Sequence, residues 1–364
     1  MPRRTVLVAG ATGLVGYAAL KHFTSQPDTR VIAVSRRRPV QLHGADFIPL
    51  DLKDADACRK AIAGLTDVSH LVYAALFELP DLVAGWRDQE QIDVNDRMLR
   101  NLLEPLAAAS PALRHVTLLQ GTKAYGVHVR PLTVPAREGR SEMREQPNFY
   151  WAQEDYLRAR QIGAPWHFTI LRPVLIVGEA IGGAMNLIPA LGVHAALMRE
   201  TSDVLSYPGG GPRVSQAVDA DLLARAIAWA GEAEAARNET FNVTNGDVFV
   251  WANVWPAIAE ALGMRPGPPA PFALRSHLTD AGEAAWDAIR GRCNLSAPGL
   301  RDFVGLSLEY ADYQMRHGHT EPGPASIVST IKIMQAGFTE VMDTEAMFRK
   351  WFRTYQMRGL LPRV

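Results

Sequence analysis

Short apolar runs alternate with amphipathic stretches over the first half of the chain. The runs are continuous rather than alternating in polarity, which is typical of strands buried on both faces of a parallel sheet. Helical patterns, for example at 55–63 and 97–109, separate most of them. We therefore predict an α/β fold with a doubly wound, Rossmann-type parallel sheet. Its first six strands are expected at 5–9, 31–34, 47–50, 70–75, 115–119 and 167–171.

The regular alternation of apolar runs and helical stretches ends after about residue 175. Helices are expected at 186–198 and 218–230 and a strand at 240–243, and the remainder is mostly helical. We predict a smaller, mostly helical C-terminal lobe that closes the substrate pocket, because ligands of open α/β sheets bind at the carboxyl ends of the strands. The predicted division places 1–175, with 215–247 returning to it, in the cofactor-binding domain, and 176–214 and 248–364 in the substrate lobe.

A glycine-rich turn joins the first predicted strand to the first predicted helix, with the spacing GxxGxxG. Its first glycine permits a tight turn, its second lets the backbone approach a pyrophosphate, and its third lets the helix pack closely on the sheet. The helix N-terminus adds free N–H groups and a positive dipole end. A purely structural turn is the alternative. The predicted cofactor contacts here are Gly10, Thr12, Gly13, Leu14, Val15 and Gly16.

The end of the second strand indicates the type of dinucleotide. An NAD site usually has a carboxylate there for the ribose 2′-OH, but this chain has Ser35, Arg36 and Arg37. An arginine pairs with a 2′-phosphate, which a carboxylate would repel, so NADPH/NADP+ is the predicted cofactor. A solvated basic turn is the alternative. Asp51 and Leu52, after the third strand, are expected near the adenine, although Asp51 could equally cap a helix that starts at Lys53.

Further cofactor contacts are expected where other strands end, because dinucleotides bind along that edge of the sheet. They are Ala74, Ala75, Gln120, Lys123, Tyr150, Pro173, Val174 and Ile176.

Candidate catalytic groups do not follow the Tyr-x-x-x-Lys pattern of ordinary short-chain dehydrogenases. Four residues after Tyr150 stands Glu154, which would raise the pKa of a tyrosine by like-charge repulsion. Lys123, at the end of the fifth strand, could project into the site and replace the missing lysine. A solvated loop lysine and a core aromatic residue are the alternatives for Lys123 and Tyr150.

Five motifs together resemble the progesterone 5-beta-reductase and iridoid synthase-like enone reductases. These are atypical extended short-chain dehydrogenases whose catalytic lysine has left the tyrosine helix. The resemblance covers nearly the full length and extends to FNVTNGD at 241–247 and to KWF at 350–352. The motifs are GATGLVG, SRRRP, LLQGTKAYG, NFYWAQEDYL and LRPVLIVG.

The resemblance implies that Lys123 is the displaced lysine and Tyr150 the catalytic tyrosine. Three departures stand out: Trp151 replaces a second tyrosine, Ala124 replaces a histidine, and the step before Lys123 is one residue shorter than in LQTGxK. The implied reaction is NADPH-dependent 1,4-addition of hydride to a small hydrophobic enone, with Tyr150 donating to the enolate oxygen.

Two other readings of the function stay open. One is a carbonyl reductase or epimerase-like enzyme of the same extended superfamily, and the other is a non-catalytic NADP-binding sensor. Trp151, Phe77 and Met185 are candidates for the pocket wall, with plain core packing as the alternative. The superfamily commonly pairs two helices across a two-fold axis, so the amphipathic stretches 93–109 and 153–162 imply a homodimer.

Composition bears on the remaining classes of function, ligand and location. Lys plus Arg and Asp plus Glu each number 38, which provides no basic excess for nucleic acid. The two cysteines, Cys58 and Cys293, form no metal or disulfide pattern, so we expect no metal and two reduced thiols in a cytoplasmic protein. No signal-peptide pattern and no membrane-length apolar run are recognised.

Overall fold

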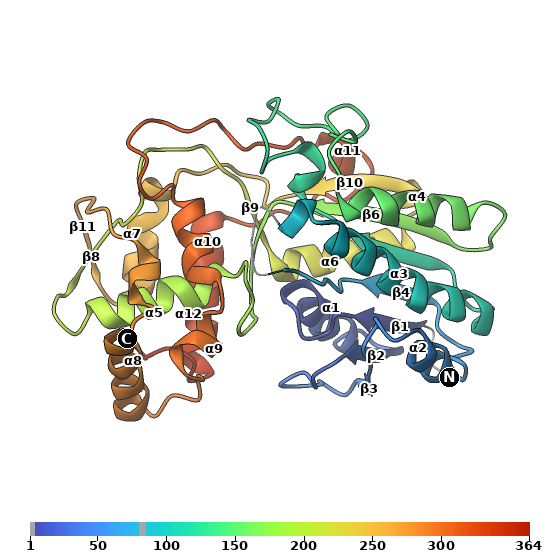
Figure 1. Ribbon diagram of the computed structural model, residues 1–364, viewed down its shortest axis with the longest axis horizontal. Coiled ribbons are helices and arrows are strands. Elements are labelled where there is room, and N and C mark those ends of the chain that lie inside the picture. Colours follow the sequence, from blue (N-terminus) through green and yellow to red (C-terminus); the bar gives the residue numbers. More distant parts are fainter. Residues whose placement is uncertain (1–3, 80–84) are drawn as a thin grey trace. The chain divides into compact units, whose positions relative to one another are not determined.

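Seven parallel strands form the main sheet, in the order β10-β6-β5-β4-β1-β2-β3 (Figure 1). The structure is a computed structural model, and it describes residues 4–79 and 85–364. The order from β3 to β6 is that of a Rossmann-type sheet, as predicted from the apolar runs that are interleaved with helical stretches. The strands are β1 (Arg4–Ala9), β2 (Thr29–Ser35), β3 (Asp46–Pro49), β4 (His70–Tyr73), β5 (His115–Leu119), β6 (His167–Pro173) and β10 (Glu239–Val243).

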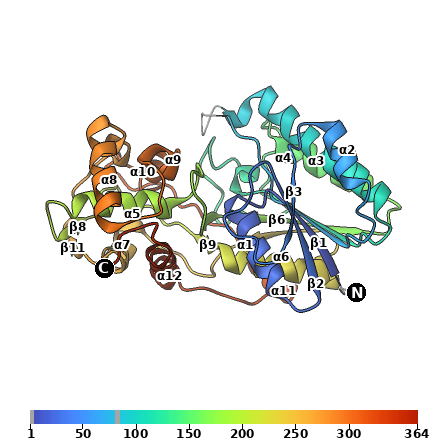
Figure 2. The ribbon, with the colours of Figure 1, turned by 90° about the horizontal axis from the view of Figure 1, so that it is seen from below.

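Helices cover both faces of this sheet, as a doubly wound fold requires (Figure 2). One face carries α2 (Ala55–Ile62), α3 (Gln89–Ala109) and α4 (Phe149–Gln161), and the other carries α1 (Leu14–Thr24) and α6 (Ala220–Glu232). Short helices lie at η1 (Gly85–Arg87), η2 (Thr122–Tyr125), η3 (Glu234–Ala236) and α11 (Ile331–Gln335).

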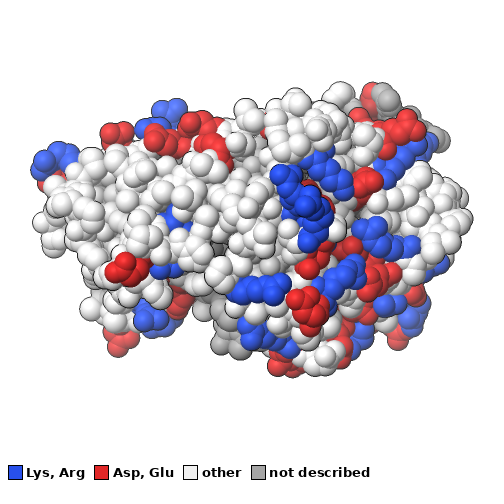
Figure 3. Space-filling view, turned by 90° about the horizontal axis from the view of Figure 1, so that it is seen from above, with Lys and Arg blue, Asp and Glu red and all other residues white. Residues whose placement is uncertain are grey.

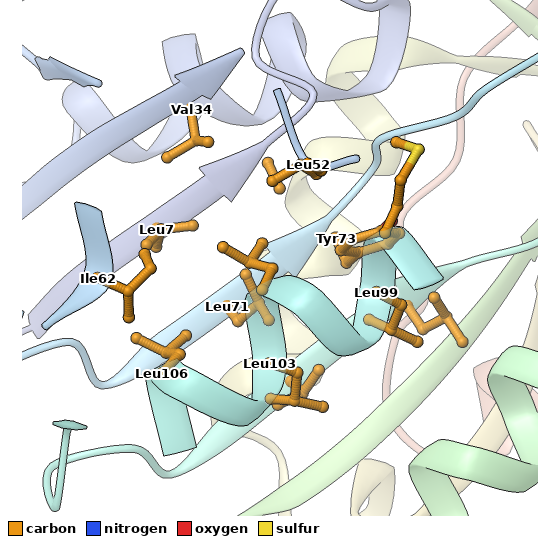
Figure 4. Close-up of a cluster of buried hydrophobic side chains, with 14 of the residues drawn as sticks. Leu7, Val34, Leu52, Ile62, Leu71, Tyr73, Leu99, Leu103 and Leu106 are labelled. Carbon is orange, nitrogen blue, oxygen red and sulfur yellow. The ribbon is translucent and has the colours of Figure 1, made fainter. Parts of the chain in front are cut away.

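The core of this unit fills the space between the sheet and α2, α3 and α4 (Figure 4). Leu7 and Leu71 project from neighbouring central strands and are fully buried. On α3, Leu99, Leu103 and Leu106 are buried as well, with the spacing that puts them on one face of a helix. This packing anchors the strands whose carboxyl ends carry the predicted site.

The second unit is mostly helical. Its helix α5 (Leu187–Met198) is buried over nearly its whole surface, because α8, α9, α10 and α12 all pack against it. The other elements are β7 (Leu175–Val177), β8 (Val204–Ser206), β9 (Ala217–Asp219), α7 (Trp251–Ala261), β11 (Arg265–Gly267), η4 (Leu274–His277), α8 (Asp280–Cys293), α9 (Leu300–Val304), α10 (Ser307–Gln314) and α12 (Thr344–Met357).

The chain crosses between the two units several times. The first comprises 1–174, 221–243 and 328–340, and the second comprises 175–220, 244–327 and 341–364. The return of 328–340 to the sheet was not part of the predicted division. Its α11 packs beside β10, where Lys332 Nζ donates to Thr240 O at 2.9 Å. A five-residue helix provides too short an amphipathic pattern to be assigned to the sheet from sequence.

Surface charges are mixed in sign. On the face drawn in Figure 3, Lys and Arg side chains are interspersed with Asp and Glu. Among the described residues, no helix combines the length and the apolar character that crossing a membrane requires. The same residues contain no group of three His, Cys, Asp or Glu side chains placed to hold a metal ion.

Candidate active site

The glycine turn lies at the carboxyl end of β1 and approaches the end of β4 closely. Gly10 has φ +83°, and a Cβ atom there would lie 2.6 Å from Ala74 O and 2.8 Å from Ala75 N. A Cβ atom on Gly16 would lie 2.1 Å from Gly10 O. Only glycine fits at Gly10 and Gly16, so the tight turn and the close approach of helix to strand both depend on them.

The N-terminus of α1 has no side-chain cap. Its N-cap residue is Gly13, which makes no capping hydrogen bond, and the first turn holds no acidic residue. The first N–H groups of a helix lack intrahelical partners, so those around Leu14 and Val15 are available to an anion. Thr12, Leu14 and Val15 are half-buried and Gly13 is exposed. An uncapped helix end beside a glycine cradle fits the pyrophosphate of a dinucleotide.

The predicted 2′-phosphate site adjoins this cradle. Both Gly10 N and Ala11 N donate to Val34 O, which holds the end of β2 against the turn. Ser35 is buried, and its Oγ donates to Arg37 O at 2.7 Å. Arg36 and Arg37 are exposed and make no side-chain hydrogen bond or ion pair with the part of the chain that the structure describes. Their guanidinium groups therefore fit a phosphate ligand.

The segment after β3 corrects one expectation about Asp51. Helix α2 begins at Ala55, and its N-cap is Asp54, whose carboxylate accepts from Ala57 N. Asp51 instead accepts from Lys53 N at 3.0 Å within a local turn. Leu52 is buried in the core, so any contact that it makes with an adenine involves its backbone.

Four of the other predicted cofactor contacts lie at strand ends, and Ile176 does not. Ala74 and Ala75 follow β4, and Pro173 and Val174 end β6 and follow it. Pro173 O lies 3.5 Å from where a Cβ of Gly121 would be. Ile176 lies on β7, in the second unit.

Tyr150 and Lys123 pack against the same aromatic ring. Lys123 Nζ lies 3.3 Å from the centroid of the Trp86 ring, and the Tyr150 ring meets Trp86 edge-on at 5.4 Å between centroids. Trp86 is held in place because its Nε1 donates to Glu78 Oε1 at 2.9 Å. A Cβ on Gly121 would lie 3.2 Å from the Tyr150 hydroxyl, so this hydroxyl reaches the carboxyl end of β5. The structure thus brings the two predicted catalytic residues together.

Burial shifts the pKa values of both Lys123 and Tyr150. It lowers the pKa of the Lys123 ammonium to about 7, against a weaker opposing effect of Glu78. It raises the pKa of the Tyr150 hydroxyl, and the negative charge of Glu78 raises it further. Tyr150 is therefore a neutral O–H donor near neutral pH. Lys123 is not a solvated loop lysine, and Tyr150, 7% exposed, is as buried as a core aromatic residue would be.

Glu154 was expected to act on Tyr150, but its carboxylate pairs with arginines instead. Its carboxylate accepts from Arg172 Nη2 at 3.0 Å, and both side chains are buried. Arg144 and Arg158 reach its other oxygen at 3.1 and 3.0 Å. With three guanidinium groups around it, Glu154 contributes no resolved effect to the pKa of Tyr150; the carboxylate that does is Glu78. The predicted like-charge repulsion between positions 150 and 154 was therefore wrong.

Arg172 organises this side of the site. Its Nε donates to Gln120 Oε1 at 2.8 Å, and Gln120 Nε2 donates to Tyr150 O at 3.1 Å. Tyr125 donates to Asn242 Oδ1 at 2.7 Å, so its hydroxyl is already engaged. The side chain of Gln120 is used in this network, and a cofactor contact from Gln120 would have to come from its backbone.

Sequence reasoning missed Glu78, Trp86 and Arg172. An arginine that ends the apolar run of β6 requires a buried counter-charge, and Glu154 on the apolar face of α4 was the available signal. Glu78 and Trp86 lie in a stretch without hydrophobic periodicity, where no sequence pattern points to them. Of the proposed wall residues, Trp151 is buried with its Nε1 bonded to Gln146 O, which is core packing.

Comparisons with known proteins identify the family of the chain. The profile of the NAD dependent epimerase/dehydratase family matches residues 6–244. An (S)-8-oxocitronellyl enol synthase of Antirrhinum majus is 29% identical over 94% of this chain and 89% of that protein. A 3-oxo-Delta(4,5)-steroid 5-beta-reductase of Arabidopsis thaliana is 34% identical over 71% of this chain and 69% of that protein.

Solved structures agree on the fold. A short-chain dehydrogenase/reductase superfamily protein of Agrobacterium tumefaciens with bound NAD matches with a TM-score of 0.64 at 18% identity, covering 98% of each chain.

Proposed function

The chain belongs to the NAD dependent epimerase/dehydratase family and, within it, to the progesterone 5-beta-reductase and iridoid synthase-like oxidoreductases, and we propose that it reduces the C=C bond of α,β-unsaturated carbonyl compounds with NADPH. The name of the Arabidopsis relative describes a reductase of a ketone conjugated to a C=C bond. The observation that carries the proposal is the pairing of Tyr150 and Lys123 on Trp86, at the carboxyl end of β5.

The cofactor proposal rests on charge. NADPH, when bound, supplies a hydride to the β-carbon of the substrate. Arg36 and Arg37 would hold its 2′-phosphate, and the uncapped end of α1 would hold its pyrophosphate. Each exposed guanidinium can donate two parallel hydrogen bonds to a phosphate, which an NADH ribose does not offer.

Tyr150 performs the electrostatic part of the reaction. As hydride reaches the β-carbon, negative charge develops on the carbonyl oxygen, and the Tyr150 O–H donates a hydrogen bond to it. The raised pKa of Tyr150 keeps this proton in place, which suits a donor to an enolate. It does not suit a base that removes a proton from an alcohol, so the same feature disfavours an epimerase or alcohol-oxidising mechanism.

Lys123 has two tasks in this scheme. Its Nζ lies over the Trp86 ring, on which Tyr150 also packs, and its partial charge there favours developing negative charge. We propose that the same Nζ binds the nicotinamide ribose. With a pKa near 7, its protonation responds to a hydroxyl or phosphate arriving beside it.

Oxidation of NADPH, followed at 340 nm with small cyclic and linear enones, tests the proposal. We expect turnover with enones and none with the matching saturated ketones. Turnover of saturated ketones would favour the carbonyl reductase reading, and stoichiometric NADPH binding without any turnover would favour a sensor.

We also propose a cytoplasmic homodimer. The free thiols of Cys58 and Cys293 suit a reducing compartment. The outer surfaces of α3 and α4 adjoin, and Arg100 there lies 4.1 Å from the Tyr156 ring centroid. A two-fold copy could pair these side chains across an interface.

A further inference from the structure

A cavity of about 730 Å³ lies at the amino edge of the main sheet, within the first unit. Residues at the starts of β1, β2, β4, β5 and β6 line it, together with the end of α6 and the segment after it. Strand β1 begins beside the end of the chain marked N in Figure 1. The glycine turn and Lys123 lie at the opposite, carboxyl edge, so the cavity is separate from the proposed catalytic site.

Three histidines stand in a row along this edge. His70, His115 and His167 open β4, β5 and β6, and the register pairs His115 with both neighbours. Paired residues of parallel strands project to the same face of a sheet, so the three imidazoles form one ladder. The rings of His70 and His115 are 6.3 Å apart.

One nitrogen of the central imidazole lacks a hydrogen-bond partner. His70 is bonded at both nitrogens, to Ser69 Oγ at 2.9 Å and to Gly231 O at 3.2 Å. His115 is 3% exposed, and its Nε2 is buried without a hydrogen-bond partner. A buried polar atom of this kind carries a desolvation cost until something bonds to it.

Three arginines and two carboxylates line the cavity around the ladder. Arg4 is paired with Glu232 at 2.6 Å, and Arg237 is in looser contact with Glu234 at 3.3 Å. Arg114 borders the cavity, is exposed, and makes no side-chain hydrogen bond or ion pair with the residues that the structure describes. Asp28 is the other acidic residue that lines the cavity.

The pKa values of two of these histidines are lowered by burial and by nearby positive groups. Burial lowers the pKa of His115 to about 3, and His70, His167 and Arg237 lower it further. Burial lowers the pKa of His70 to about 4, with Arg4 and Arg114 acting in the same direction. His70 and His115 are therefore neutral near pH 7, and the neighbouring arginines disfavour their protonation further.

We propose that this cavity binds a small dianion, such as a phosphate ester or a dicarboxylate. Arg114 and Arg237 would pair with its charge from the rim, and His115 would gain the bonding partner that it lacks. The volume accommodates a small metabolite. Because the cavity lies at the other edge of the sheet, binding does not compete with the dinucleotide.

Ring signals of the histidines in ¹H–¹³C spectra provide the test. The protein is saturated with NADP+, so that the nucleotide cradle is filled, and titrated at pH 7 and constant ionic strength with inorganic phosphate or with malonate. We expect saturable shifts of the His70, His115 and His167 signals, with H115Q used for assignment. The stronger of the two probes identifies the ligand as a phosphate or a dicarboxylate.

Two variants decide the result. R114A with R237A removes two charge-assisted contacts and should weaken binding at least about tenfold. R140A, which also removes an exposed arginine but lies outside the cavity, should bind as the wild type does. Absence of saturable shifts with both probes overturns the proposal, as does equal weakening by R140A or unchanged affinity in the double variant.

Discussion

Replacing Glu154 by lysine would recreate the Tyr-x-x-x-Lys spacing of ordinary short-chain dehydrogenases, and the structure predicts that it destabilises the first unit instead. The side chain at this position points to Arg172, which is 1% exposed, and not to Trp86. Arg144 and Arg158 contact the same carboxylate. A lysine there would add a fourth cation to three guanidinium groups.

The size of the effect follows from burial. Removing one partner of a buried ion pair costs about 3–5 kcal/mol, and Glu154→Lys adds repulsion to that loss. We expect the free energy of unfolding to fall by about 4–5 kcal/mol or more, a large part of the roughly 5–15 kcal/mol typical of a folded protein. Glu154→Gln should cost less, about 2–3 kcal/mol, because Glu142 still pairs with Arg172 at 2.7 Å.

Urea denaturation followed by circular dichroism measures these differences. Asp155→Lys is the matched control, since it makes the same charge change one residue away on a side chain that is 63% exposed. It should cost no more than about 1 kcal/mol. The reasoning is refuted if Glu154→Lys is as stable as Asp155→Lys, or if it turns over enones faster than the wild type.

Four further outcomes are expected. Replacing Arg36 and Arg37 together by alanine should remove the preference for NADPH over NADH in measured dissociation constants; a preference that persists would place the 2′-phosphate elsewhere. Tyr150→Phe should lower kcat by a factor of about 10²–10³ with little change in NADPH affinity, and unchanged rates on every accepted enone would exclude Tyr150. In denaturation experiments Lys123→Met should be more stable than the wild type by the largest margin below pH 7, and this margin should shrink as the pH rises toward 10.5. Between these two pH values the unfolded wild type binds one more proton than the folded wild type, so the stability of the wild type rises with pH. A stability difference that is independent of pH would contradict the lowered pKa. Light scattering should give about twice the 39.9 kDa mass of the chain, and the monomer mass would contradict the dimer.

Local sequence determined much of the nucleotide-binding half. Continuous apolar runs and the glycine spacing predicted β1, its turn and α1, because each depends on neighbours along the chain. The arginines after β2 were recognised for the same reason: a strand end and its next residues are adjacent in sequence. Tyr150 and Lys123 were identified by motif, and their short-range setting, at the start of α4 and the end of β5, was predictable.

Tertiary structure alone decided what surrounds those two residues. Glu78 reaches the Tyr150–Lys123 pair through Trp86, and Arg172 reaches Glu154 on α4 from strand β6. Burial sets the direction of both pKa shifts, while Glu78 adds to the shift of Tyr150 and opposes that of Lys123, and both effects depend on side chains distant in sequence. The sequence by itself determined which elements form and which residues end them. Which charges face each other, and thus why a glutamate can stand where a lysine is usual, followed only from the packing of α4 against β5 and β6.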